Sequence, residues 1–80
     1  MEKAVALKYT LELPAPFIIA KGKRELAKKI EEIARKNGIP IVKNYELTEG
    51  LIGLELGSFI PEEYYEVIAK ILVFVAKFGV

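Results

Sequence analysis

The sequence contains no cysteine and no histidine. The first absence excludes disulfides and thiol nucleophiles, and the second removes imidazole, the commonest general base. The same two residue types supply most zinc ligands in proteins. We therefore expect no catalytic residue, no metal site and no cofactor, and interpret the chain as a non-enzymatic protein.

Aspartate and glutamine are also absent, so all eleven acidic residues are glutamates. Enrichment in Glu and Lys with few thermolabile residues is typical of thermophilic proteins, and we expect a thermophilic protein. The two charge signs nearly cancel, leaving a net charge of +1. Such a chain has no strong field to attract nucleic acid or anionic lipid, which argues against both as partners.

Long apolar runs are lacking too, although apolar residues make up 52% of the chain. The longest strongly apolar run, Ile71 to Ala76, is far shorter than the roughly 20 residues that span a bilayer, and no signal-peptide pattern opens the chain. We expect a cytoplasmic protein with no membrane span of its own. Eighty residues without a linker or an internal repeat predict a single domain, 1–80.

Three short apolar segments predict strands. Ala4 to Tyr9 is followed by a proline-containing loop, and Phe17 to Ala20 is a continuous apolar run that suits a central strand covered on both faces. Ile39 to Val42 is the third, and Pro40 indicates a strand start or an edge position. Because a helix is predicted between the second and third segments, we expect those two strands to be parallel, with a right-handed crossover.

Helical periodicity is clearest from Lys23 to Lys36, and the Asn37–Gly38 pair supplies a stop signal. The aliphatic stripe of this helix consists of Leu26, Ile30, Ile33 and Ala34. The stretch from Asn44 to Gly57 predicts a short, weak helix, because glycines interrupt it and each costs about 1 kcal/mol relative to alanine in a helix interior.

The last predicted helix has Pro61 at its first position and Gly79 beyond its end. Its inward stripe consists of Ile68, Ile71, Leu72 and Val75. Val73 and Phe74 lie off that stripe, so the final turns need a second cover. The predicted fold class is α/β, with a small mixed sheet of about three strands covered by two or three helices and the C-terminal helix packed across it.

Basic residues surround a glycine at the predicted strand-to-helix turn, where a helix N-terminus can hold a phosphate. They are Lys21, Lys23, Arg24, Lys28 and Lys29. The turn has a single glycine, Gly22, and matches neither phosphate-loop pattern, and glutamates interleave with the lysines. An ordinary solvated helix face is therefore the favoured interpretation.

Two other groups of residues are candidates for sites. The glutamate pairs Glu31–Glu32 and Glu62–Glu63 are neighbours on helices, so they point about 100° apart and do not form an acid/base dyad. The tyrosines Tyr45, Tyr64 and Tyr65 lack the basic and aromatic interleaving of an RNA-binding sheet. Half-buried or surface tyrosines are the favoured interpretation.

The order of the segments carries more information than any one of them. "AVALKY", a proline-containing loop, "AKGK" followed by "ELAKKI", "NGIPIVKN", and "IPEEYYEVIAKILVFV" occur in that order with similar spacing. This arrangement resembles the C-terminal cytoplasmic domain of the FlhB-type export-switch proteins (FlhB, YscU, SpaS) of flagellar and type III secretion systems. The resemblance covers nearly the whole chain.

The resemblance also implies a self-cleavage motif, Asn-Pro-Thr-His, just ahead of the strand that matches "AVALKY". In that motif the Asn side-chain amide attacks its own carbonyl and cuts the Asn–Pro bond. Alignment on Ala4 places the motif at or before Met1, with Glu2 and Lys3 in the last matching places. We therefore expect a short stand-alone homologue that lacks the motif. The alternative is a cleavage-derived fragment of a longer protein, against which the initiating Met argues.

The resemblance implies a binding module that contacts export-apparatus components or export substrates. The expected functional surface consists of Lys8, Tyr9, Ala20, Lys21 and Gly22. An alternative is a small RNA-binding or ribosome-associated α/β module that uses the Lys21 to Lys29 cluster. A third is a homodimer, suggested by the apolar end of the last helix and by a first strand without an upstream neighbour.

Overall fold

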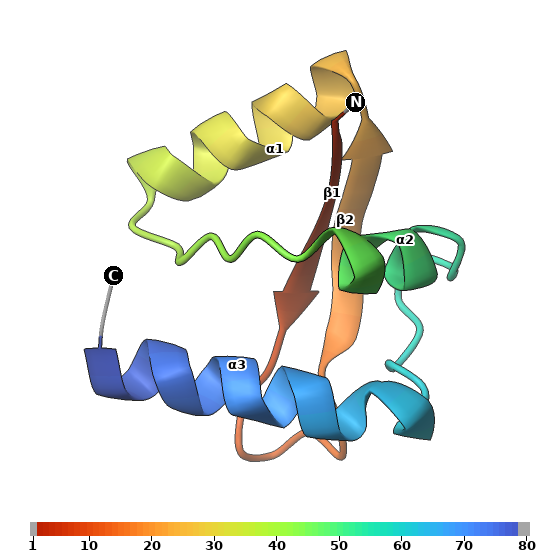
Figure 1. Cartoon of the computed structure of the whole chain (residues 1–80), viewed down its shortest axis with the longest axis vertical. Coiled ribbons are helices and arrows are strands. Elements are labelled where there is room, and N and C mark those ends of the chain that lie inside the picture. Colours follow the sequence, from red (N-terminus) through yellow and green to blue (C-terminus); the bar gives the residue numbers. More distant parts are fainter. Residues whose placement is uncertain (1, 79–80) are drawn as a thin grey trace.

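The computed structural model describes residues 2–78 and shows a two-stranded antiparallel hairpin combined with three α-helices (Figure 1). The elements are β1 (Lys3–Lys8), β2 (Phe17–Lys23), α1 (Glu25–Lys36), α2 (Tyr45–Ile52), a 3₁₀ turn (Glu62–Tyr64) and α3 (Tyr65–Phe78). In Figure 1, α1 lies beside one end of the hairpin, α3 runs across the other end, and α2 lies between them. The predicted α/β class and the covering helices are confirmed.

The hairpin pairs Lys3 with Lys23 at one end and Lys8 with Phe17 at the other, with a register shift after Ala6. On its other side the start of β2 is bonded to a later segment, since the Ile18 amide donates to the Ser58 carbonyl at 3.0 Å. The first residues of β2 are therefore central, as predicted, and Ile18 is fully buried. The sequence also predicts that both faces of this strand are covered. That prediction is wrong at Ile19, which is 50% exposed.

The predicted third strand, Ile39 to Val42, is wrong. These residues carry no strand pairing and connect α1 to α2 as irregular chain, so the predicted parallel crossover is wrong as well. Their β-branched side chains are largely exposed, with Ile39 at 53% and Val42 at 43%. Strand preference is realised only when a neighbouring strand supplies hydrogen bonds and side-chain contacts, and none of the residues that the structure describes does so here.

The turn between β2 and α1 consists of one residue, Arg24, so α1 starts two residues later than predicted. Arg24 has φ 52°, a conformation that favours glycine, and its amide donates to the Glu2 carbonyl at 2.7 Å. Helix α1 packs against the hairpin with the small residue Ala27 in the contact, where it is fully buried. The predicted stripe lies at the margin of this contact, with Leu26 and Ile33 each 52% exposed.

The second half of the chain supplies most of the core. Asn44 caps α2 by accepting from the Leu47 amide, which explains why a helix forms despite its glycine. The main cluster of buried side chains consists of Ala15, Leu51, Ile60 and Ile68. Pro61 precedes the 3₁₀ turn, so α3 begins later than predicted, at Tyr65, and Gly79 lies outside the described residues.

The C-terminal half of α3 is poorly covered, as the sequence predicts. Val73 is 62% exposed and Phe74 is 57% exposed. Between residues 2 and 78, no helix combines the length and apolar character needed to cross a membrane.

Candidate functional site

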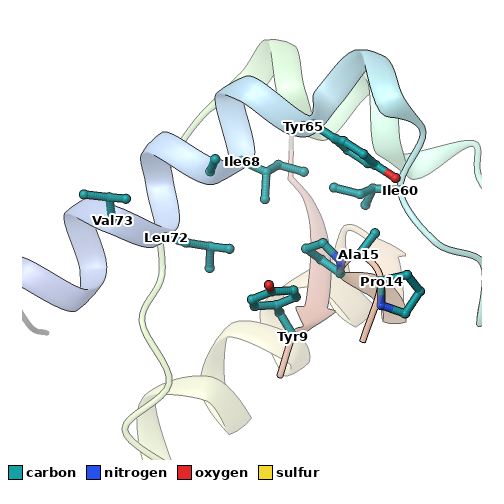
Figure 2. A pocket seen from close by; sticks show the side chains of 10 residues that line it. Tyr9, Pro14, Ala15, Ile60, Tyr65, Ile68, Leu72 and Val73 are labelled. Atoms are coloured by element: carbon teal, nitrogen blue, oxygen red, sulfur yellow. The ribbon is translucent and has the colours of Figure 1, made fainter. Parts of the chain in front are cut away.

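An open apolar groove of about 350 Å³ lies between the β1–β2 loop and α3, and we call it the α3 groove (Figure 2). The loop side is formed by Tyr9, Pro14, Ala15 and Pro16, and the helix side by Ile60, Tyr65, Ile68, Ala69, Leu72 and Val73. The floor is buried, with Ala15, Ile60 and Ile68 each at most 3% exposed. The rims stay open, with Tyr9 and Tyr65 each 44% exposed.

Backbone hydrogen bonds hold the loop side of the groove in place. The Leu13 amide donates to the Thr10 carbonyl at 3.0 Å and closes a turn within the loop. The Ile60 amide donates to the Pro16 carbonyl at 2.9 Å and ties the loop to the chain that enters α3. Proline restricts the backbone further at positions 14 and 16. The groove is therefore largely preformed, which lowers the entropic cost of filling it.

The chemistry of the groove is that of a binding site for apolar groups. The two tyrosine hydroxyls are the side-chain polar groups among its lining residues. No cluster of metal-ligating side chains is found in the part of the chain that the structure describes. A few polar groups on an apolar surface can orient a ligand, and the lining residues carry no carboxylate or amine side chain beside the two phenols.

The five residues predicted from sequence lie at two separate places. Lys8 and Tyr9 lie at the loop end of β1, and Tyr9 lines the α3 groove. Ala20, Lys21 and Gly22 lie along β2 opposite Ala6, Val5 and Ala4, towards the other end of the hairpin. Sequence reasoning missed the groove itself, although Val73, one of the two residues that it placed off the inward stripe of the last helix, lines it.

The side chain of Lys21 is held by hydrogen bonds at the C-terminal end of α2. Its ammonium group donates to the Ile52 carbonyl at 3.0 Å and also to the Leu54 carbonyl. Ile52 ends α2, so this cation satisfies a carbonyl at the negative end of the helix dipole. Lys23 and Lys28 are exposed, which agrees with the solvated face predicted for the rest of the basic cluster.

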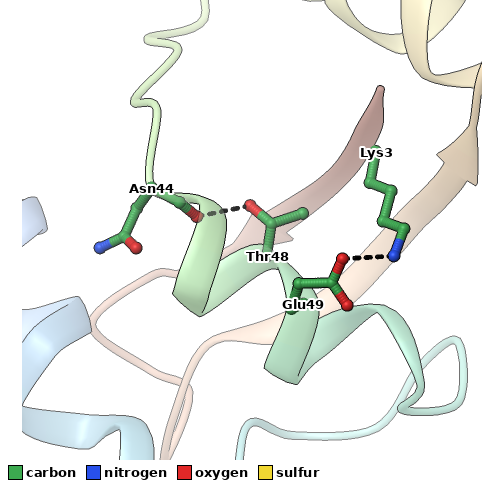
Figure 3. Close-up of polar contacts among 4 residues, drawn as sticks. All are labelled: Lys3, Asn44, Thr48 and Glu49. Carbon is green, nitrogen blue, oxygen red and sulfur yellow. Dashed lines mark hydrogen bonds and ion pairs between the residues drawn. The ribbon is translucent and has the colours of Figure 1, made fainter. Parts of the chain in front are cut away.

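A second polar contact joins β1 to α2 (Figure 3). The Lys3 ammonium forms a hydrogen-bonded ion pair with the Glu49 carboxylate. Near it, the Thr48 hydroxyl donates to the Asn44 carbonyl at 2.9 Å within the first turn of α2. The hydrogen bond from Lys3, followed by its charge, lowers the pKa of Glu49 below the ordinary glutamate value.

This ion pair predicts a pH dependence. A lowered folded-state pKa means that the pair stabilises the fold above about pH 4.3, the ordinary glutamate value, and that the effect is lost as pH falls through the lowered pKa. An NMR titration of the side-chain carboxyl should give a higher Glu49 midpoint in Lys3→Met than in the unmodified chain. Equal midpoints would contradict the assignment.

A family model described as the FlhB HrpN YscU SpaS Family matches residues 1–75. The chain belongs to the FlhB family. The flagellar biosynthetic protein FlhB of Bacillus subtilis is 42% identical over 76 residues, which are 92% of this chain and 21% of that protein. A short relative, the uncharacterized protein YlqH of Bacillus subtilis, is 40% identical over 78 residues, which are 96% of this chain and 84% of that protein.

Solved structures of FlhB-family domains share the fold. The cytoplasmic domain of FlhB from Shewanella putrefaciens superposes with a TM-score of 0.88 at 36% identity, and the match covers 95% of this chain and 64% of that one. A mutated EscU/SpaS C-terminal domain gives a TM-score of 0.88 at 28% identity, covering 94% and 95%. The resemblance read from the order of segments is thereby confirmed. The chain corresponds to the C-terminal domain of the export-switch proteins and spans about a fifth of the length of the flagellar relative.

Proposed function

We propose that this FlhB-family domain is a non-enzymatic binding module on the cytoplasmic side of a flagellar or type III export apparatus. It binds an export substrate or a protein component of the apparatus through the α3 groove. The observation that carries this proposal is the groove itself, with a buried floor and open apolar rims on an export-family fold.

The groove suits a short peptide segment with large apolar side chains. Its volume of about 350 Å³ lies at the lower end of the range for small-ligand pockets, and its lining is mostly aliphatic. The hydroxyls of the half-exposed Tyr9 and Tyr65 can hydrogen-bond to the peptide backbone, since a phenol both donates and accepts. Apolar side chains of the segment would cover the exposed faces of Leu72 and Val73.

A single substitution on α3 tests this proposal. Leu72→Glu places a charge in the groove, and burying an unpaired carboxylate under a peptide should weaken binding about tenfold or more. The binding measurement is isothermal titration of the purified chain with a purified early flagellar export substrate. Leu72 is 38% exposed, so its replacement should leave the fold intact.

Phe74→Glu is the matched control, because it introduces the same charge on the same helix. Phe74 is 57% exposed and is not among the groove-lining residues. We expect the control to bind like the unmodified chain. Equal weakening by both variants, or no weakening by Leu72→Glu, would remove the groove from the proposed function.

A further inference from the structure

Helix α2 contains a glycine, Gly50, at an interior position, where glycine is unfavourable relative to alanine because its backbone loses more freedom on folding. The backbone conformation does not require glycine there, since the described glycines with a positive φ are Gly38 and Gly57. The reason is space. A Cβ atom at position 50 would lie 2.9 Å from Cζ and 3.1 Å from Cε1 of Tyr64, and closer still to the hydroxyl oxygen. The ring of Tyr64 therefore rests on α2 at Gly50.

Tyr64 leads directly into the helix side of the α3 groove. It ends the 3₁₀ turn, its amide donates to the Pro61 carbonyl at 3.0 Å, and its half-buried side chain packs against the core cluster. The next residue, Tyr65, is the first of α3 and lines the groove. Figure 2 shows Tyr65 and Ile60 at one end of the groove and Leu72 towards the other. The position of Tyr64 therefore determines where the helix wall of the groove begins.

On the other side of the contact, α2 is anchored to the hairpin at two places. Glu49, next to Gly50, forms the ion pair with Lys3 of β1. The Ile52 carbonyl, two residues beyond Gly50, accepts from Lys21 of β2 at 3.0 Å. Within residues 2–78, α3 approaches the strands and the other α-helices closely at very few positions. A displacement at the contact should therefore move the start of α3 rather than α2.

We propose that the contact between Gly50 and Tyr64 positions the helix wall of the α3 groove. It fixes the start of α3 against α2 and thereby sets the separation between the Tyr65 end of the helix wall and the loop wall. Neither Gly50 nor Tyr64 is among the residues that line the groove, so both act through Tyr65 and Ile60. The effect on binding rests on the proposed function, because a preformed groove binds at a lower entropic cost than one that must be ordered.

Gly50→Ala tests the positioning role. The added methyl group displaces the Tyr64 ring, so the groove amides of Tyr65 and Ala69 should show larger chemical-shift changes than the amides of the hairpin. Gly53→Ala is the matched control, because it makes the same substitution at the end of the same helix and a Cβ atom there meets nothing within 4 Å. The control should leave the groove amides unchanged.

Binding of a purified early flagellar export substrate, measured by isothermal titration, is the second readout. Gly50→Ala should weaken binding about fivefold, whereas Gly53→Ala should not weaken it. Tyr64→Leu removes the three ring atoms that the added methyl group would meet. The double variant G50A/Y64L should therefore bind more tightly than Gly50→Ala alone. Two substitutions that each merely reduced stability would not rescue one another.

Several outcomes would overturn the proposal. One is a set of groove shifts in Gly50→Ala no larger than those in Gly53→Ala, and another is a double variant that binds no better than Gly50→Ala. Equally large shifts in the hairpin, at Val5 and Lys21, would show a general loss of packing and would overturn it too.

Two further results separate the positioning role from folding and from the proposed function. Should Gly50→Ala fail to fold, the groove shifts of Tyr64→Leu decide the question, because that variant removes the contact without a clash. If the unmodified chain does not bind the substrate while the groove shifts appear as expected, the proposed function fails and the positioning contact stands.

Discussion

Gly22→Val should lower the melting temperature by about 10 to 20 °C, the equivalent of about 2 to 3 kcal/mol in a domain of this size. A Cβ atom at Gly22 would lie 2.8 Å from the Cβ of Leu26 and closer still to other atoms of that side chain. The turn at Arg24 brings the first turn of α1 back over the end of β2, and this produces the close approach.

The Leu26 side chain is half exposed and can rotate away, but its Cβ is fixed by the helix backbone. A valine side chain at position 22 should therefore push α1 away from the hairpin. Lys29→Ala is the control, since Lys29 is an exposed residue of α1 and its loss should change stability by no more than about 0.5 kcal/mol. Thermal melts followed by circular dichroism measure both. Equal melting temperatures for the two variants would show that the close approach at Gly22 does not exist.

Lys21→Met should destabilise the fold by about 2 to 3 kcal/mol, because hydrogen bonds to charged groups are the stronger ones and two are lost. Methionine keeps the aliphatic length of lysine but cannot donate to the carbonyls of Ile52 and Leu54. Those carbonyls end α2 and begin the chain that leads to Ser58, which is bonded to β2. The substitution should therefore loosen α2 from the hairpin.

The matched control is Lys23→Met, which changes the same residue type two positions along β2. Lys23 is exposed, so the stability of this control should stay close to that of the unmodified chain. Urea denaturation measures both differences. If Lys21→Met is as stable as Lys23→Met, the two carbonyl bonds contribute nothing and Lys21 is free for a role at the surface.

The sequence predicts local elements well and non-local contacts poorly. The first two strands, α1 and the last helix follow from apolar periodicity and from stop signals that act within a few residues. The segment Ile39 to Val42 has the same local signal as the true strands, yet a strand exists only when another strand lies beside it. The orientation of α1 was also mispredicted in part, because the small residue Ala27 allows a closer approach than the aliphatic stripe does.

The candidate site depends even more on contacts between distant parts of the chain. The α3 groove joins residues of the loop after β1 to residues of α3, more than forty positions apart. Its one early signal was the excess of apolar residues in the last helix. The role of Lys21 could not be predicted either. A cluster of basic residues in the sequence does not indicate which lysine donates to backbone carbonyls of another element.

An amide chemical-shift titration would show where on this chain an export protein binds. The isotope-labelled chain would be titrated with an unlabelled early flagellar export substrate. If the α3 groove is the binding site, shifts should concentrate on the groove residues Tyr9, Tyr65, Ala69 and Leu72. Shifts confined to the basic face of α1, at Lys28 and Lys29, or no shifts at all, would contradict it.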